Sequence, residues 1–178
     1  RLDVFTRVIT DGGKAFDEIA PGYTGTLWLE VVPLSFTVRV HEGLALNQVR
    51  LIAGDRVSLT DDEVRARHTE DGLLFRADQA VAPEDFRIAS GLFLGLDLEG
   101  DAEGRVGHRA KPHTALLDMG RISAYDAEDY WEPVKREEGD RIVLAPGAFY
   151  LLLSDEAVVI PPDLAAEMTA YDPTAGEL

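Results

Sequence analysis

A carboxylate lies inside an apolar segment of this chain, and it is the residue best suited to move a proton. Glu30 stands in the sequence TLWLEVV, whose other members are mainly apolar. On the two-residue period of a strand, Glu30 shares a face with Trp28 and Val32, while Leu27, Leu29 and Val31 point to the other face, which we take as the core. Burial beside Trp28 would raise the pKa of this carboxyl group and make it a proton acceptor near neutral pH. The pattern alone favours the simpler alternative, a solvated glutamate on an outer face.

Two further features near this strand could contact a ligand. The segment APGYTG is a Pro-Gly turn in which backbone amides can approach a ligand closely, and Tyr23 offers a surface for stacking. The pattern favours an ordinary turn leading into a strand. Four arginines on or beside predicted strands could bind phosphate in a bidentate manner, with solvated strand residues as the alternative. They are Arg1, Arg7, Arg39 and Arg50.

The residue inventory excludes several classes of active site. The chain has no cysteine, which removes disulfides, thiolate metal sites and the zinc nucleobase deaminases, and which fits a reducing cytoplasm. The four histidines, at positions 41, 68, 108 and 113, form no H-x-x-x-H pair, so a histidine metal site is not indicated. Neither a glycine-rich phosphate loop nor a G-x-S-x-G motif is present.

The formal net charge of −16 sets limits on the partners of this chain. An acidic surface repels a phosphate backbone, so we do not expect binding to nucleic-acid polymers. A small anionic substrate is compatible with this charge, because a pocket needs only local cations or Mg²⁺ to hold phosphates. The simpler interpretation of the charge is solubility. No apolar run reaches the roughly 20 residues of a membrane span.

Short strands separated by Gly and Pro turns are expected to position these residues. They are LDVFTRVIT, TLWLEVV, FTVRV and ALNQVRLI in the first third, then GLFLGLDLEG, HTALLDM and three strands around APG near the end. HEG predicts a hairpin turn with Gly43 at positive φ. Thr60 and Glu63 have the spacing of a capping box and predict a short helix, whereas 73–91 predicts a loop. This pattern is typical of an all-β barrel or jelly roll with little helix.

Several of these segments resemble dCTP deaminases of the dUTPase-like superfamily. RLDVFTRVIT, FDEIAPGYTGTLWLEV and FTVRVHEGLALNQVRLI resemble the second half of a deaminase domain, and LAPGAFYLLLSDEAVVIPPDLAAEM resembles the first half. GLFLGLDLEG and KPHTALLDM resemble earlier strands of that first half. The halves occur in reversed order. The resemblance is therefore to tandem two-domain bacterial deaminases, and it implies a dUTPase-like distorted jelly roll.

The resemblance also implies a division of the chain. Residues 1–55 would be the C-terminal half of a first domain, 56–88 a linker, and 89–178 the N-terminal half of a second domain. We therefore expect a piece of a longer protein, which on its own would lack part of the active site.

The resemblance assigns roles to individual residues. It implies zinc-independent hydrolytic deamination of dCTP to dUTP and ammonia, with Glu30 as the general base and Arg1 as the arginine of an S-S-x-x-R motif. Val8, Ile9 and Thr10 would read the pyrimidine edge through their backbone, and Tyr23 and Gln48 would contact the nucleotide. Mg²⁺ would accompany the triphosphate, and the assembly would be a cytoplasmic homo-oligomer of the trimer type.

One departure from the family pattern concerns the substrate. Ala20 occupies the position of an aspartate that, in dUTPases of this superfamily, contributes to water activation. This departure argues against the first rival function, dUTP diphosphatase. Asp17, in a lengthened loop, is a possible substitute. The second rival is a non-catalytic barrel of the same fold that serves oligomerisation or regulation.

Overall fold

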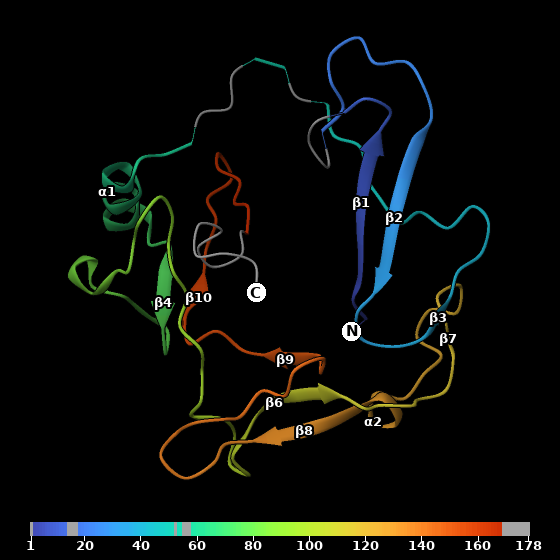
Figure 1. Ribbon diagram of the computed structural model, residues 1–178. Coiled ribbons are helices and arrows are strands. Elements are labelled where there is room, and N and C mark those ends of the chain that lie inside the picture. The colour runs from blue at the N-terminus through green and yellow to red at the C-terminus, as the bar shows by residue number, and fades with distance from the viewer. Residues whose placement is uncertain (1, 14–17, 52, 55–57, 169–178) are drawn as a thin grey trace. The chain divides into compact units, whose positions relative to one another are not determined.

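The computed structural model describes residues 2–13, 18–51, 53–54 and 58–168 (Figure 1). The chain divides into two compact units, each built from two separate stretches of sequence. The first unit comprises Arg1–Gly54 and Leu98–Leu153, and the second comprises Asp55–Asp97 and Ser154–Leu178. The predicted division into domain halves and a linker follows the order of the sequence, and it stays a prediction.

The strand that carries Glu30 forms an antiparallel ribbon with the first predicted strand. Strand β1 (Val4–Thr10) pairs with β2 (Leu27–Pro33) along its whole length, from Val4 opposite Pro33 to Thr10 opposite Leu27. Alternating β-branched and apolar residues favour this extended conformation in both strands. Among the described strands, β1 and β2 form a sheet of their own.

A three-stranded antiparallel sheet forms the other main part of the first unit. Its central strand, β6 (Arg105–Ala110), pairs with β8 (Trp131–Lys135) on one side and with β9 (Tyr150–Leu152) on the other. The short helix α2 (Ala127–Tyr130) leads directly into β8, and Asp126 caps its N-terminus through a hydrogen bond from the Glu128 amide.

The two stretches of the first unit meet at a parallel strand pair and a cluster of aromatic side chains. Strand β3 (Val38–Arg39) pairs with β7 (Leu117–Asp118). Beside this pair, Phe36 packs edge-on against Tyr130 and Trp131, with ring centroids 5.2 and 5.0 Å apart. These three buried rings are the core of the unit, and aromatic pairs in this geometry contribute beyond the area that they bury.

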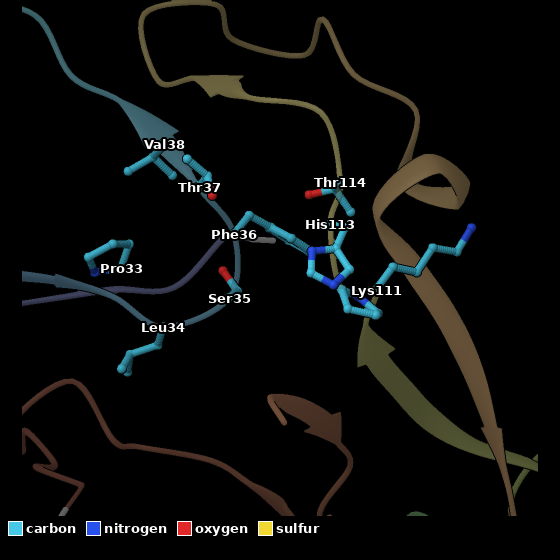
Figure 2. A pocket seen from close by; sticks show the side chains of 10 residues that line it. Pro33, Leu34, Ser35, Phe36, Thr37, Val38, Lys111, His113 and Thr114 are labelled. Atoms are coloured by element: carbon cyan, nitrogen blue, oxygen red, sulfur yellow. The ribbon is translucent and has the colours of Figure 1, made fainter. Parts of the chain in front are cut away.

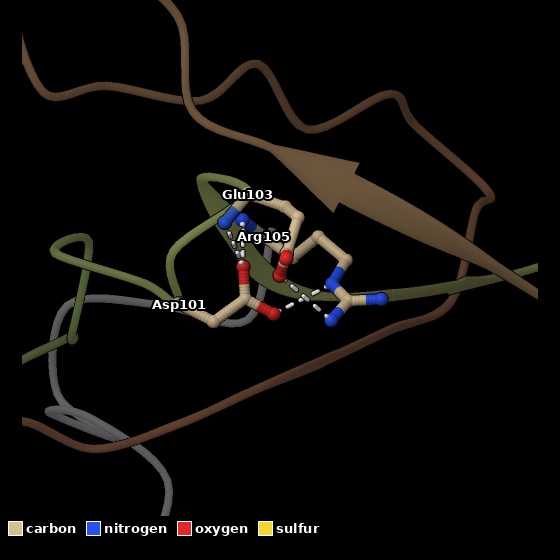
Figure 3. Close-up of polar contacts among 3 residues, drawn as sticks. All are labelled: Asp101, Glu103 and Arg105. Atoms are coloured by element: carbon tan, nitrogen blue, oxygen red, sulfur yellow. Dashed lines mark hydrogen bonds and ion pairs between the residues drawn. The ribbon is translucent and has the colours of Figure 1, made fainter.

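The turn before β6 is held by one aspartate (Figure 3). Oδ1 of Asp101 accepts hydrogen bonds from the backbone amides of Glu103 and Arg105, at 3.0 and 2.9 Å, and Oδ2 accepts one from Nε of Arg105. The hydrogen bonds from Arg105 are the main reason why the pKa of Asp101 is lowered. Gly104 has φ +72°, a conformation that glycine adopts without strain.

The second unit contains the helix predicted at Thr60. Helix α1 (Asp61–Asp71) begins with a complete capping box, in which the Glu63 amide donates to the Thr60 hydroxyl and the Thr60 amide donates to the Glu63 carboxylate. His68 near the end of α1 is buried, and its Nδ1 accepts hydrogen bonds from the amides of Leu73 and Leu74, while its Nε2 donates to the carbonyl of Val81.

A small sheet and an apolar cluster complete the second unit. Strand β4 (Leu74–Arg76) pairs with β5 (Gln79–Ala80) and with β10 (Ala157–Val158), and a 3-10 turn, Pro83–Asp85, follows β5. The core of the unit consists of the buried side chains Leu74, Val81 and Phe86.

The prediction of a loop over 73–91 was wrong for the β4–β5 hairpin. Its two-residue turn is formed by Ala77 and Asp78, both at positive φ, in the arrangement that joins tightly twisted strands. The usual signal for such a turn is glycine or asparagine, so the sequence did not reveal it.

Two of the predicted strands are absent or reduced to isolated bridges in the described part of the chain. Gly43 does adopt positive φ, +83°, but residues 44–51 form no strand in the described structure. The reason is that β3 pairs with β7 rather than with the segment after the turn. Likewise, GLFLGLDLEG contributes only isolated bridges, at Leu92 and Leu96. Within the described residues, helices long and apolar enough to cross a membrane are absent.

Candidate active site

Glu30 forms an ion pair across the β1–β2 ribbon. Arg7 lies directly opposite Glu30 in the antiparallel register, and its Nε donates to Oε2 of Glu30. The Glu30 side chain is 37% exposed and that of Arg7 is 32% exposed. A carboxylate held in this way has a fixed orientation yet remains accessible to a small molecule. Arg7 is thereby engaged with Glu30, whereas the sequence offered it as one of four phosphate-binding candidates.

The predicted division of β2 into a core face and an outer face was wrong. Leu27, Leu29 and Val31, expected in the core, are all exposed, and Trp28 on the Glu30 side is 60% exposed. Glu30 is partly exposed, whereas the other residues of β2 are all exposed. The reason is that a two-stranded ribbon covers neither of its own faces. The contact that distinguishes Glu30 is therefore its pairing with Arg7 rather than burial beside Trp28.

The predicted pyrimidine-reading strand is β1. Val8 and Thr10 are buried, whereas Ile9 is exposed. Their partners on β2 are Leu29, Trp28 and Leu27, at the end of the ribbon that follows the Arg7–Glu30 pair. The structure thus brings these residues close in register to Glu30, and their role in reading the base stays a prediction. Arg1, the predicted catalytic partner of Glu30, and Asp17 lie outside the described residues.

Tyr23 is held by its own turn. Its amide donates to the carbonyl of Ala20 at 3.1 Å, and its hydroxyl donates to the carbonyl of Thr26 at 2.6 Å. The ring lies so close to Gly25 that a Cβ there would approach the Tyr23 hydroxyl to 2.9 Å. Gly22 at φ +79° completes the turn. These contacts fix the entry to β2, and a contact of Tyr23 with the nucleotide stays a prediction.

The segment that carries Gln48 runs beside β1. The Thr6 hydroxyl donates to the carbonyl of Leu46 at 3.4 Å, which ties the segment to the ribbon. Gln48 itself is exposed. Its neighbour Asn47 has a buried Oδ1 without a hydrogen-bond partner among the described residues. Such an atom is costly unless a ligand or water satisfies it. Sequence reasoning missed Asn47, since an isolated asparagine carries no motif.

Metal ligands do not gather in the described part of the chain. There, no group of three or more His, Asp or Glu side chains is arranged to hold a metal ion. A protein cage for Mg²⁺ is therefore not offered by these residues, and we assign no chemical step to a metal held by them. Mg²⁺ can still enter on the phosphates of a nucleotide, since it is commonly bound through substrate phosphates and few protein ligands.

Comparisons with known proteins place both parts of the chain in one family. Residues 1–55 match the N-terminal domain of 2′-deoxycytidine 5′-triphosphate deaminase, and residues 60–178 match the C-terminal domain of the same family. No curated protein matches the chain.

A solved structure gives the same result. The crystal structure of 2′-deoxycytidine 5′-triphosphate deaminase from Agrobacterium tumefaciens is similar to this chain with a TM-score of 0.73 and 35% sequence identity. The match covers 99% of this chain and 51% of that deaminase, so the chain spans about half of its length. The prediction of an all-β, dUTPase-like fold is confirmed by this likeness and by the strands described above.

Proposed function

The chain belongs to the 2′-deoxycytidine 5′-triphosphate deaminase family, and from this premise we propose that the protein containing it converts dCTP and water to dUTP and ammonia. The observation that supports this function within the chain is the Arg7–Glu30 pair. It presents an accessible carboxylate in a fixed orientation on β2, as activation of a water molecule requires.

The proposed reaction is a hydrolysis in which Glu30 shuttles one proton. Oε1 of Glu30 accepts a proton from water while Oε2 retains the hydrogen bond from Arg7. The oxygen of that water forms a bond to C4 of the cytosine ring. The C4–N3 double bond opens onto N3 in this step. The tetrahedral centre then re-forms a carbonyl at C4 and expels the 4-amino group, which takes one water proton from Glu30 and leaves as ammonia, while the second water proton, from the C4 hydroxyl, ends on N3. Atoms and charge balance without any oxidant or reductant.

Other residues of the chain would bind the nucleotide. The backbone of Val8, Ile9 and Thr10 would read the pyrimidine edge, and Tyr23 and Gln48 would contact the nucleotide further along, with Asn47 added on the ground of its buried carbonyl oxygen. Arg1 would stabilise charge that develops at the ring. Mg²⁺ would arrive as the counter-ion of the triphosphate, and the working assembly would be a cytoplasmic homo-oligomer.

The test is a product analysis with the full-length protein. Incubation with dCTP should release ammonia and form dUTP, and Glu30→Gln should slow ammonia release by roughly 10²–10⁴-fold, the usual contribution of a general base. Undiminished ammonia release in this variant would remove Glu30 from the mechanism.

The same assay separates the two rival functions. Pyrophosphate released from dUTP would show a diphosphatase, although Ala20 speaks against that activity. A barrel that serves only oligomerisation or regulation through its fold would release neither product. In that case dCTP would also fail to raise the melting temperature, because a ligand that binds the native state stabilises it.

A further inference from the structure

A cavity of about 400 Å³ lies within the first unit, apart from Glu30. Figure 2 shows its two walls: residues 33–38, which join β2 to β3, and residues 111–114, which follow β6. A volume of this size falls within the range of small-molecule sites. Glu30 is not among the lining residues, so the cavity and the proposed catalytic carboxylate can be tested separately.

The lining of the cavity differs in charge from the rest of the chain. Of its ten residues none is acidic, although the chain carries a net charge of −16. Lys111 and His113 are basic, and hydroxyl groups come from Ser35, Thr37 and Thr114. The remaining walls are apolar, formed by Pro33, Leu34, Phe36, Val38 and Pro112. This combination suits an anionic group attached to a compact apolar or aromatic body.

Three polar side chains that line the cavity, one on the 33–38 wall and two on the 111–114 wall, are not engaged by the rest of the fold. Within the described residues, the side chains of Thr37, His113 and Thr114 make no hydrogen bond. In Figure 2 the His113 ring and the Thr114 hydroxyl lie on the side of the cavity that faces Phe36 and Thr37. Two hydroxyls and an imidazole are a donor set that phosphate oxygens can accept from.

Lys111 and the backbone at His113 add to this arrangement. The Lys111 ammonium donates to the carbonyl of Glu128 at 2.6 Å, and in Figure 2 its side chain extends away from Phe36 and Thr37, so Lys111 contributes positive charge near the rim rather than a contact inside the cavity. His113 has φ +57°, a left-handed conformation that is strained for residues other than glycine. Strain of this kind is found at ligand clamps, where the orientation of a side chain matters more than its stability cost.

We propose that this cavity binds a small phosphate monoester, with His113, Thr114 and Thr37 contacting the phosphate, Lys111 neutralising it from the rim, and the apolar wall contacting the organic group. The site is distinct from that of the proposed deamination and does not depend on it. The choice of a nucleotide as the probe below does rest on the proposed function, whereas recognition of the phosphate does not.

The test measures binding of three probes to the full-length protein by calorimetry. They are a deoxynucleoside 5′-monophosphate, the same nucleoside without phosphate, and inorganic phosphate. Hydrogen exchange locates the site, and we expect protection of the segment 109–116 on addition of the nucleotide. The nucleotide should bind more tightly than either part alone. Equal binding of nucleoside and nucleotide, or protection confined to β1 and β2, would overturn the proposal.

Substitutions at the strained position provide the second arm. His113→Gly removes the imidazole at a positive φ that glycine adopts without strain, so we expect the variant to fold. We expect nucleotide affinity at this site to fall about tenfold, as for loss of one hydrogen bond to a charged group. His108→Gln, at an exposed position on β6, is the matched control and should leave binding unchanged. Unchanged affinity in His113→Gly would contradict the proposal.

Two further readings complete the experiment. Lys111→Gln should weaken binding, whereas Lys135→Gln, an exposed lysine on β8, should not; equal effects would indicate general charge attraction and overturn the site. Ammonia release from dCTP is measured in the same variants and should stay at the wild-type rate. Loss of deamination together with unchanged binding would contradict the assignment of His113 to a separate site.

Discussion

Two arginine–glutamate pairs of the first unit have the same local geometry and different surroundings. Arg7 and Glu30 lie opposite each other on β1 and β2, and Arg109 and Glu132 lie opposite each other on β6 and β8. In both pairs the partners are 23 residues apart and the arginine Nε donates to the carboxylate. Both pairs are about one-third to two-fifths exposed. A cross-strand ion pair by itself therefore does not mark an active site.

The surroundings show what separates the two pairs. Glu132 follows the buried Trp131, and β6 has a second neighbour, β9, from which Tyr150 reaches Arg109. The hydrogen bonds that Arg109 makes, first to the Glu132 carboxylate and then with Tyr150, raise the pKa of Arg109. Glu30 instead lies on a ribbon whose other β2 residues are exposed. The first pair thus lies on an uncovered two-stranded ribbon, whereas the second belongs to a three-stranded sheet and lines, with Tyr150, a cavity of about 220 Å³.

The largest effect should separate the two glutamates in catalysis. We expect Glu30→Gln to reduce dCTP deamination by roughly 10²–10⁴-fold, because it removes the proposed base. Glu132→Gln is the matched control and should leave the rate within about twofold, in line with the small worth of a half-exposed ion pair. Steady-state ammonia release measures both. Comparable losses in the two variants would mean that the pairs share a structural role.

A second contrast uses the two tryptophans beside the pairs. Trp131→Ala should lower the free energy of unfolding by about 3–5 kcal/mol, since it opens a cavity beside Phe36 and Tyr130. Trp28→Ala should cost no more than about 0.5 kcal/mol, because the side chain is 60% exposed. Denaturant unfolding of the protein measures both. A large cost at Trp28 would show that another part of the assembly covers the ribbon.

Double-mutant cycles should find the two ion pairs equal in stability. Because both pairs are partly exposed to water, we expect a coupling energy of about 0–1 kcal/mol for Arg7–Glu30 and for Arg109–Glu132. The cycles use Arg→Gln and Glu→Gln variants and urea unfolding. A coupling well above this range at Glu30 alone would point to a structural origin of any activity lost there.

The smallest expected effect concerns the place where the two regions join. Asp118 on β7 accepts hydrogen bonds from His41 at 2.8 Å and from the Gly120 amide at 2.9 Å, and Arg39 lies 3.9 Å away. The bond from His41 is the main reason why the pKa of Asp118 is lowered. A lowered native pKa stabilises the fold above the unfolded value, about 3.9, and this contribution disappears as the pH falls through the native pKa.

Asp118→Asn should therefore flatten the loss of stability below about pH 4 and leave its dependence at higher pH unchanged. Melting temperatures between pH 2.5 and 7 measure this, with Asp62→Asn in the first turn of α1 as an exposed control. An identical acid profile in wild type and Asp118→Asn would contradict the role of this carboxylate.

The sequence was sufficient where local chemistry decides the structure. The capping box at Thr60 and Glu63 needs only four residues, so helix α1 was predicted from them and confirmed. The strand of Glu30 was also predicted, since its residues are mainly β-branched, aromatic and other apolar types that favour strands. The family resemblance rested on short motifs, and the comparisons confirm the family.

The sequence was insufficient where a distant partner decides the structure. Nothing near Val38 indicates that it pairs with Leu117, and this parallel pairing takes the place of a pairing with the predicted strand ALNQVRLI, residues 45–52, whose described part forms no strand. Nor does the two-residue period reveal that neither face of β2 is covered. For the same reason, Arg7 could not be chosen among the four candidate arginines as the partner of Glu30 before the register of β1 and β2 was known.

The first unit cannot be completed until its second stretch has been synthesised, because a stretch of the second unit lies between its two parts in the sequence. His41 cannot contact Asp118 until the ribosome has added 77 further residues. At the usual rate of synthesis, the first stretch of the unit therefore lacks the second for roughly 4 to 15 s. During that interval Phe36, which is buried against Tyr130 and Trp131 in the finished unit, is exposed on the nascent chain. We therefore expect the segment around Phe36 to be a binding site for chaperones during translation, released when Tyr130 and Trp131 emerge.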